Sequence, residues 1–116
     1  MAEPRVFKRS ELQWRPYGDG PGEASLAGLI GEEESKYMGV GVGRFDGTSI
    51  EWTVKYDEVF FGLEGTTRIR VDGKAYEAGP GDVLWIPEGT SLRYEGDQAT
   101  CFYALSPVDW RSRQQS

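Results

Sequence analysis

The sequence contains no histidine and a single cysteine, Cys101, among its 116 residues. Without histidine, the chain lacks the side chain that most often binds transition metals in proteins. One cysteine cannot form an internal disulfide, which is typical of a protein in a reducing compartment. Cys101 lies in the apolar run 100–105, TCFYAL. We therefore interpret it as a buried structural thiol, the alternative being a reactive one.

Long apolar runs and an excess of basic residues are also missing. No stretch approaches the ~20 apolar residues that cross a bilayer, and residues 1–5, MAEPR, lack the apolar core of a signal peptide. The net charge is −6, so binding to nucleic acid has no electrostatic support. We expect a soluble cytoplasmic protein whose partners include neither nucleic acid nor a membrane.

The composition nevertheless supports a folded core. Hydrophobic residues make up 38% of the chain and aromatic residues 13%, which excludes a disordered chain. The length is near the commonest size of one domain. We predict a single domain over 1–116, with an N-terminal arm (1–23), a barrel (24–106) and a C-terminal tail (107–116). The arm is expected to hold one helical turn near 10–13, capped by Ser10, and the tail to be frayed.

Alternating apolar and polar residues, interrupted by turn residues, predict an all-β fold. Two alternating runs lie around residues 56–58 and are closed by Glu64-Gly65. The other predicted turns are 46–47, 72–73, 79–82, 87–89 and 96–97, and the other predicted strands are 24–30, 36–45, 83–86, 91–95 and 99–105. Turns about ten residues apart are the pattern of a β-sandwich or β-barrel.

Glycines 39, 41 and 43 form a G-x-G-x-G pattern inside one predicted strand. A phosphate-binding loop would need a helix directly after the glycines. Here a turn at 46–47 follows, and another strand begins at Ile50. The three glycines share one face of the strand, so close packing of a neighbour or room for a ligand explains them better.

The central segment resembles the cupin superfamily. Glu58 and Gly65 match the second half of the first cupin motif, G-x5-H-x-H-x3/4-E-x6-G. Gly81, Pro87 and Gly89 match the start of the second, G-x5-P-x-G-x2-H-x3-N. The two motifs occur in the expected order and separation, and the resemblance covers most of the chain. It implies a small jelly-roll β-barrel of two antiparallel sheets.

The histidine positions of these motifs are occupied by other residues. In metal-binding cupins three histidines and the glutamate hold a divalent ion inside the barrel. Here the first histidine pair falls on Trp52 and Val54, or on the residue before each, and the last falls on Leu92. Glu58 alone remains, and one carboxylate cannot form an octahedral site for a first-row metal. We predict no bound metal and no other cofactor.

A narrower resemblance is to the EutQ-like cupins of ethanolamine utilisation. Residues 52–58 (WTVKYDE), 63–65 (LEG) and 107–110 (PVDW) resemble W-T-x-x-Y-D-E, V-L-E-G and P-A-N-W in that family. Its members also lack the histidine set. The resemblance implies a homodimeric cytosolic cupin that is linked to bacterial microcompartments and credited with an acetate kinase activity.

Alternation along the strands indicates which side chains face the barrel interior. The cupin resemblance places Glu58 inside, and Tyr94 lies on the same predicted face two residues after Leu92. A desolvated carboxylate can act as an acid or a base, so Glu58 and Tyr94 are the candidate catalytic residues. The alternative is a hydrogen-bonded Glu58 that braces a turn. The candidate ligand-binding residues are Trp52, Val54, Tyr56, Leu92, Tyr103 and Lys36.

Two classes of function follow. The first is a metal-free cupin that binds a small organic ligand in the barrel, with acid/base or acyl-phosphate chemistry through Glu58. Phosphoryl transfer has little support from the residues themselves, since only Lys36 and Lys55 lie near the predicted mouth. The second is a non-catalytic homodimer that works by assembly with a partner protein. Its arm or an edge strand would cross the dimer interface.

Overall fold

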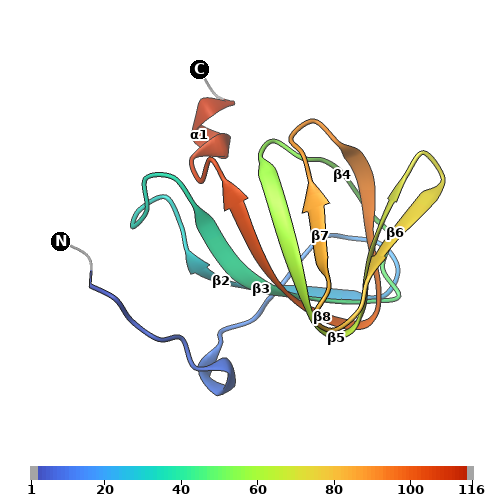
Figure 1. Cartoon of the computed structure of the whole chain (residues 1–116), viewed down its shortest axis with the longest axis horizontal. Helices are drawn as coiled ribbons and strands as arrows, with labels where there is room; N and C mark the ends of the chain where they lie inside the picture. Colours follow the sequence, from blue (N-terminus) through green and yellow to red (C-terminus); the bar gives the residue numbers. More distant parts are fainter. Residues whose placement is uncertain (1–2, 115–116) are drawn as a thin grey trace.

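The computed structural model describes residues 3–114, which form an antiparallel β-barrel (Figure 1). The strands are β1 (Arg15–Pro16), β2 (Glu23–Ile30), β3 (Gly39–Asp46), β4 (Ile50–Thr53), β5 (Asp57–Val71), β6 (Lys74–Ala78), β7 (Val83–Ile86) and β8 (Ser91–Ser106). A 3-10 helix, η1 (Arg9–Glu11), precedes them and a short helix, α1 (Trp110–Arg113), follows. Residues 1–2 of the predicted arm and 115–116 of the predicted tail lie outside this range. Neither helix of residues 3–114 has the length and apolar character to span a bilayer.

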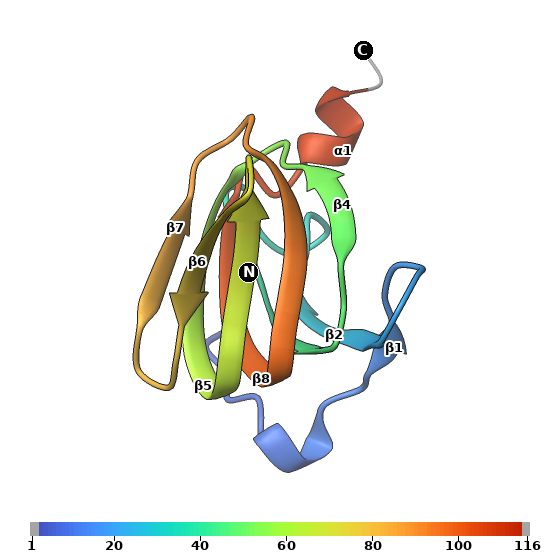
Figure 2. The ribbon, with the colours of Figure 1, turned by 90° about the vertical axis from the view of Figure 1, so that its right-hand side faces the viewer.

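The two long strands, β5 and β8, build the barrel because each belongs to two sheets (Figures 1 and 2). They pair with each other along most of their length, while their other partners change halfway. The first half of β5 pairs with β7 and the second half with β6. The first half of β8 pairs with β4 and the second half with β3. One sheet therefore runs β1-β2-β3-β8-β5-β7 and the other β4-β8-β5-β6, which confirms the predicted all-β barrel of antiparallel sheets.

Two of the predicted turns lie inside these long strands. Glu64-Gly65 does not end a strand, and Gly96-Asp97 does not separate two strands, because β5 and β8 continue through both points. Instead, the register between β5 and β8 shifts on either side of Glu64, and Gly65 has a φ of 63°. Such a bulge bends a strand and increases its twist. Glycine is favoured both in bulges and in turns, so the sequence pattern predicts a turn where the structure has a bulged, continuous strand.

The C-terminal segment also differs from the expected frayed tail. Residues 110–113 form α1, which lies at the end of the barrel where β4 ends (Figure 2). The Trp110 ring packs against Trp52 and Tyr56, at centroid distances of 5.8 and 5.3 Å. A four-residue helix is too short to show a periodic pattern in the sequence. At the other terminus, the predicted helical turn forms as η1, but no side chain caps it, so the Ser10 cap is wrong.

The space between the sheets is filled by buried apolar residues from both. Val54 and Ile86 are fully buried, and Phe45, Phe60, Ile69 and Leu84 pack in the same cluster. Cys101 belongs to this core and is a free thiol. Its burial raises the pKa of the thiol to about 11, so it stays protonated and unreactive at neutral pH. The interpretation of Cys101 as a structural residue agrees with this environment.

Candidate functional site

A cavity of about 370 Å³ opens between the two sheets at the end of the barrel that carries α1. Its walls are mostly aromatic, and a single carboxylate reaches it. The lining residues are Tyr17, Leu26, Phe45, Trp52, Tyr56, Glu58, Phe60, Tyr94, Tyr103, Leu105, Trp110 and Arg111. A concave, largely apolar space with few polar groups is the usual form of a small-molecule site.

Glu58 provides that carboxylate from the start of β5. It is only 4% exposed, and its neighbours across the sheet are Leu105 on β8 and Ile86 on β7. The Tyr94 hydroxyl donates a hydrogen bond of 2.9 Å to Glu58 Oε1. Burial raises the pKa of Glu58 to about 7, and the hydrogen bond from Tyr94 partly opposes this rise. No described residue places a cation against the carboxylate.

The aromatic side chains around Glu58 are held by one another. Trp52 Nε1 donates a hydrogen bond of 3.2 Å to the Tyr56 hydroxyl. The Phe45 and Phe60 rings each lie 5.8 Å from the Tyr94 ring, centroid to centroid. Burial, reinforced by the negative charge of Glu58, raises the pKa of both Tyr56 and Tyr94. These hydroxyls therefore remain protonated at neutral pH and can donate hydrogen bonds.

The glycine pattern of β3 makes room for another tyrosine of the cavity. A Cβ atom at Gly41 would lie 2.4 Å from the Tyr103 hydroxyl oxygen, so only glycine fits beside that side chain. Tyr103 faces the cavity from β8, and burial raises its pKa to about 12. The strand phase that the sequence leaves open is thus settled by the structure. The glycines serve close packing rather than phosphate binding.

Five of the eight predicted site residues line this cavity: Trp52, Tyr56, Glu58, Tyr94 and Tyr103. Val54 and Leu92 do not, because both lie in the core below it, at 1% and 3% exposure. Val54 follows the end of β4, and its backbone pairs with the turn residues Gly89 and Thr90. Lys36 lies in a loop outside the cavity, with its ammonium 5.6 Å from the centre of the Tyr37 ring.

Several cavity residues are missing from the sequence prediction. Phe60 has the same strand phase as Glu58, so alternation along β5 indicates its position. Trp110 belongs to the PVDW segment, which carries the family resemblance but gives no indication of where the ring lies. Tyr17 comes from the N-terminal arm, and its contact with Phe45, at 6.5 Å between ring centroids, leaves no local pattern in the sequence.

The cavity does not fit a transition metal. Within residues 3–114 no three histidine, cysteine, aspartate or glutamate side chains come together. Glu58 is the one acidic residue of the lining. The motif histidine positions hold Trp52 and Val54 or, in the other alignment, Glu51 and Thr53, neither of which lines the cavity, and the last position holds Leu92. First-row metals need several nitrogen or oxygen ligands, which this lining does not offer.

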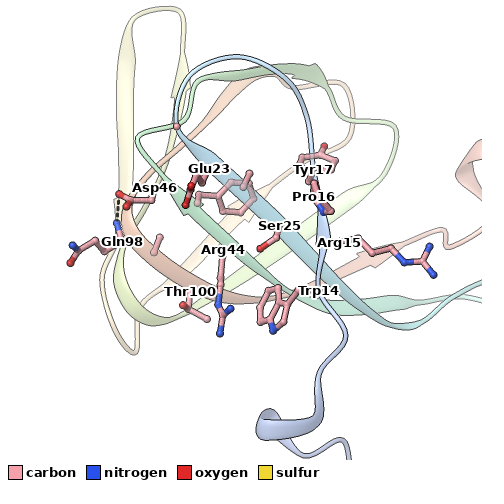
Figure 3. Close-up of a pocket in the computed structure, with 14 residues that line it drawn as sticks. Trp14, Arg15, Pro16, Tyr17, Glu23, Ser25, Arg44, Asp46, Gln98 and Thr100 are labelled. Atoms are coloured by element: carbon pink, nitrogen blue, oxygen red, sulfur yellow. Dashed lines mark hydrogen bonds between the residues drawn. The ribbon is translucent and has the colours of Figure 1, made fainter.

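A larger hollow of about 760 Å³ lies outside the barrel, where the N-terminal arm crosses β2 and β3 (Figure 3). Two of its charged side chains, Arg44 and Asp46, have partners. The Arg44 guanidinium lies 3.9 Å from the centre of the Trp14 ring, and Asp46 accepts a 3.0 Å hydrogen bond from the Gln98 backbone N–H. Arg44 and Asp46 are exposed, so the groove lacks the desolvated acid that distinguishes the inner cavity.

Comparison with known proteins supports the resemblance found in the sequence. The family described as ethanolamine utilisation protein EutQ matches residues 10–112. The protein named acetate kinase EutQ from Clostridioides difficile strain 630 is 34% identical over 82 residues, which cover 70% of this chain and 52% of that protein. The protein of the same name from Salmonella typhimurium strain LT2 is 32% identical over 96 residues, which cover 82% of this chain and 42% of that protein. The chain thus matches about half of these relatives' length.

Solved structures of EutQ proteins and of another cupin have the same fold as this chain. A putative ethanolamine utilization protein Q from Salmonella typhimurium LT2 superposes with a TM-score of 0.81 at 29% identity, covering 89% of this chain and 85% of that one. The Clostridium difficile EutQ structure superposes with a TM-score of 0.72 at 30% identity, covering 77% of this chain and 71% of that one. An RmlC-like cupin from Shewanella frigidimarina NCIMB 400, at 15% identity and a TM-score of 0.67, covers 90% of this chain and 92% of that one, and shares the fold. The chain belongs to the EutQ family of ethanolamine-utilisation cupins.

Proposed function

We propose that this chain binds a small organic ligand in the aromatic cavity without a metal, and that Glu58 exchanges a proton with that ligand. The burial of Glu58 in a cavity that has room for a ligand is the observation that carries the proposal. One carboxylate oxygen accepts the hydrogen bond from Tyr94. The other has no hydrogen-bond partner among residues 3–114 and is available to a ligand.

The chemistry that this arrangement supports best is acid/base catalysis. A group is most effective when its pKa lies near the working pH, because both protonation states are then populated. Burial brings the pKa of Glu58 to about 7. Glu58 is therefore the proton donor or acceptor, and Tyr94 is the positioning residue that fixes the orientation of its carboxylate. The other tyrosine hydroxyls offer neutral hydrogen bonds to a bound molecule.

Phosphoryl transfer, which the names of the relatives indicate for them, has less support in this cavity. Transfer of a phosphoryl group needs concentrated positive charge at the phosphate oxygens. The one basic residue of the lining is Arg111, which is exposed and has its guanidinium 4.9 Å from the centre of the Trp110 ring. Lys36 and Lys55 do not line the cavity. An acetate kinase activity of this chain would thus need cations from elsewhere.

Native mass spectrometry against a metabolite pool tests the binding proposal. The wild-type chain is expected to retain a small molecule, and Glu58→Gln to lose it. Glu88→Gln makes the same chemical change on the exposed turn between β7 and β8 and is expected to bind like wild type. Retention by Glu58→Gln equal to that of Glu88→Gln would refute a role for the carboxylate in binding.

A second candidate function, assembly, is favoured by the outer face of the larger sheet. In β7 the residues Leu84 and Ile86 are buried, so Val83 and Trp85 point outward, at 65% and 57% exposure. Directly paired residues share a face of a sheet, which extends this face across four strands. Its first row is Val42, Phe102, Phe61 and Val83, and its second row is Val40, Ala104, Val59 and Trp85. Val42 is itself covered, at 7% exposure, so the accessible part of the face lies on β8, β5 and β7 and at Val40.

The outer face of the other sheet has the opposite character. There Arg68 pairs with Glu77 at 2.7 Å and Arg70 with Glu95 at 3.0 Å, as expected of a face in water. The apolar face carries no charge in its eight positions. Because a two-fold axis pairs a surface with its own copy, and apolar sheet faces pack well on one another, we propose a second copy of this chain as its occupant.

Light scattering tests this assembly. The wild-type chain is expected at about twice 13.0 kDa, and Trp85→Glu at about the monomer mass, because a charge cannot be buried in an apolar interface. Tyr76→Glu, at an exposed residue of β6 outside the two rows, is the control and is expected to stay dimeric. A monomeric wild-type chain at micromolar concentration would refute the dimer.

A further inference from the structure

We infer that the cavity selects a small organic ammonium, with Glu58 as its counter-ion and the rings of Trp52, Tyr56 and Trp110 as its wall. This inference rests on the proposed function, because it names the chemistry of the ligand that the cavity takes. It follows from three properties of the cavity: its charge, the arrangement of its rings and its volume.

The charge of the cavity favours a cation. Glu58 is the only acidic residue among the lining residues, and it is almost completely buried. The single basic residue, Arg111, is exposed and stacks on Trp110. A buried carboxylate without a cation is unfavourable, and a positively charged partner relieves that cost. An anionic ligand would instead place a second negative charge beside Glu58.

The Trp110 ring meets the rings of Trp52 and Tyr56 at an angle rather than stacking on them, and the Arg111 guanidinium lies over it, 4.9 Å from the ring centre. The Trp52 and Trp110 planes meet at 70°, and the Tyr56 and Trp110 planes at 56°. The hydrogen bond from Trp52 to the Tyr56 hydroxyl fixes these two side chains relative to each other. Faces of tryptophan and tyrosine attract cations through their quadrupole, and several such faces around one point form the cages that bind quaternary ammonium groups.

The volume restricts the size of the ligand. At about 370 Å³, the cavity is near the lower end of the range for small-molecule sites. It has room for an ammonium with a short carbon chain. An uncharged aromatic molecule of the same size would also fit among the rings, but it would leave the Glu58 carboxylate without a partner.

Isothermal titration calorimetry with matched probes tests the inference. Choline is compared with 3,3-dimethyl-1-butanol, which replaces the nitrogen by carbon and keeps the shape, and ethanolamine is compared with ethylene glycol. Acetate serves as the anionic probe. The full chain is expected to bind at least one ammonium about tenfold or more tightly than its uncharged counterpart, a difference of about 1.4 kcal/mol.

Variants assign this preference to named residues. Glu58→Gln is expected to weaken ammonium binding about tenfold or more and to change binding of the uncharged counterpart less than about twofold. Trp110→Phe keeps a ring and is expected to retain more affinity than Trp110→Ala. Glu88→Gln should match the wild type. Thermal melts confirm that each variant is folded before it is titrated.

The outcomes separate the inference from the function on which it rests. If an uncharged probe or acetate binds as tightly as the ammonium, or if Glu58→Gln leaves the preference for ammonium unchanged, the ammonium inference is refuted. The proposed function stands in that case if wild type still captures a ligand that Glu58→Gln loses. If no probe binds and no molecule is retained from the metabolite pool, both are refuted.

Discussion

Replacing Glu58 by glutamine is expected to change how the stability of the chain depends on pH. Burial raises the pKa of Glu58 from 4.5 to about 7 in the folded state. Between these two values the folded chain keeps a proton that the unfolded chain has released. Stability falls with increasing pH wherever the folded state binds more protons. Protonated Glu58 should thus contribute fully to the free energy of unfolding of the wild-type chain below about pH 4.5. This contribution should be lost as the pH rises through about 7.

The size of this loss follows from the pKa difference. Each unit of difference between folded and unfolded states is worth about 1.4 kcal/mol, so a rise from 4.5 to about 7 corresponds to about 3 kcal/mol of the free energy of unfolding. The hydrogen bond from Tyr94 is already included, because it lowers that pKa. Glutamine keeps the shape of the side chain and has no charge, so Glu58→Gln should lack this pH-dependent loss.

Urea unfolding followed by tryptophan fluorescence measures the effect, at a fixed protein concentration because self-association also changes stability. The difference in unfolding free energy between Glu58→Gln and wild type is expected to grow by about 3 kcal/mol between about pH 4 and pH 9. Glu88→Gln, at an exposed position, should follow wild type throughout. Parallel curves for Glu58→Gln and wild type would show that Glu58 titrates like an exposed carboxylate and would refute the reasoning.

Three further predictions concern Tyr94, the β5 bulge and metal content. Tyr94→Phe removes the hydroxyl that donates to Glu58, so the loss of stability should move to higher pH, and ligand binding should weaken less than in Glu58→Gln; an unchanged pH profile would contradict this. Gly65→Ala forces a Cβ to 2.1 Å from the Gln98 carbonyl oxygen at a φ of 63° and should cost more than about 2 kcal/mol, whereas Gly73→Ala, with no atom within 4 Å, should cost about 1 kcal/mol in chemical denaturation. Elemental analysis of the purified chain should find no stoichiometric iron, manganese, nickel or zinc, and about one equivalent that is lost in Glu58→Gln would overturn the fit argument.

Local patterns explain why the fold is predictable from this sequence. Apolar alternation and turn residues act over a few positions, so the strands at 24–30 and 83–86 are predicted close to their observed bounds. The same locality explains the errors at Glu64-Gly65 and Gly96-Asp97. Whether a glycine ends a strand or bends it depends on the strand beside it, and β5 and β8 stay paired on both sides of the bulge.

The cavity is less predictable because its walls come from distant parts of the chain. Glu58 and Tyr94 follow from a motif and from strand phase, and their hydrogen bond joins residues 36 positions apart. Trp110 and Tyr17 reach the cavity from the two terminal segments, where no alternation indicates the direction of a side chain. Val54 is a residue that the sequence places in the lining but the structure does not. A motif position implies a place in the lining, but the backbone leaves β4 after Thr53 and carries the side chain into the core.

The replacement of the histidines gives the remaining glutamate a different environment from that of a metal ligand. In the metal-binding cupins that the sequence resembles, a cation compensates the charge of this carboxylate. Here Leu92 and, in one of the two alignments of the motif, Trp52 occupy histidine positions, and among residues 3–114 only the Tyr94 hydroxyl donates a hydrogen bond to Glu58. One neutral hydrogen bond offsets part of the cost of burying a charge but not all of it, which is why the pKa of Glu58 stays near 7. The uncompensated part would be available to a ligand that supplies a positive charge or accepts the proton, so the burial that weakens the fold at high pH is expected to strengthen binding of the ligand that we propose.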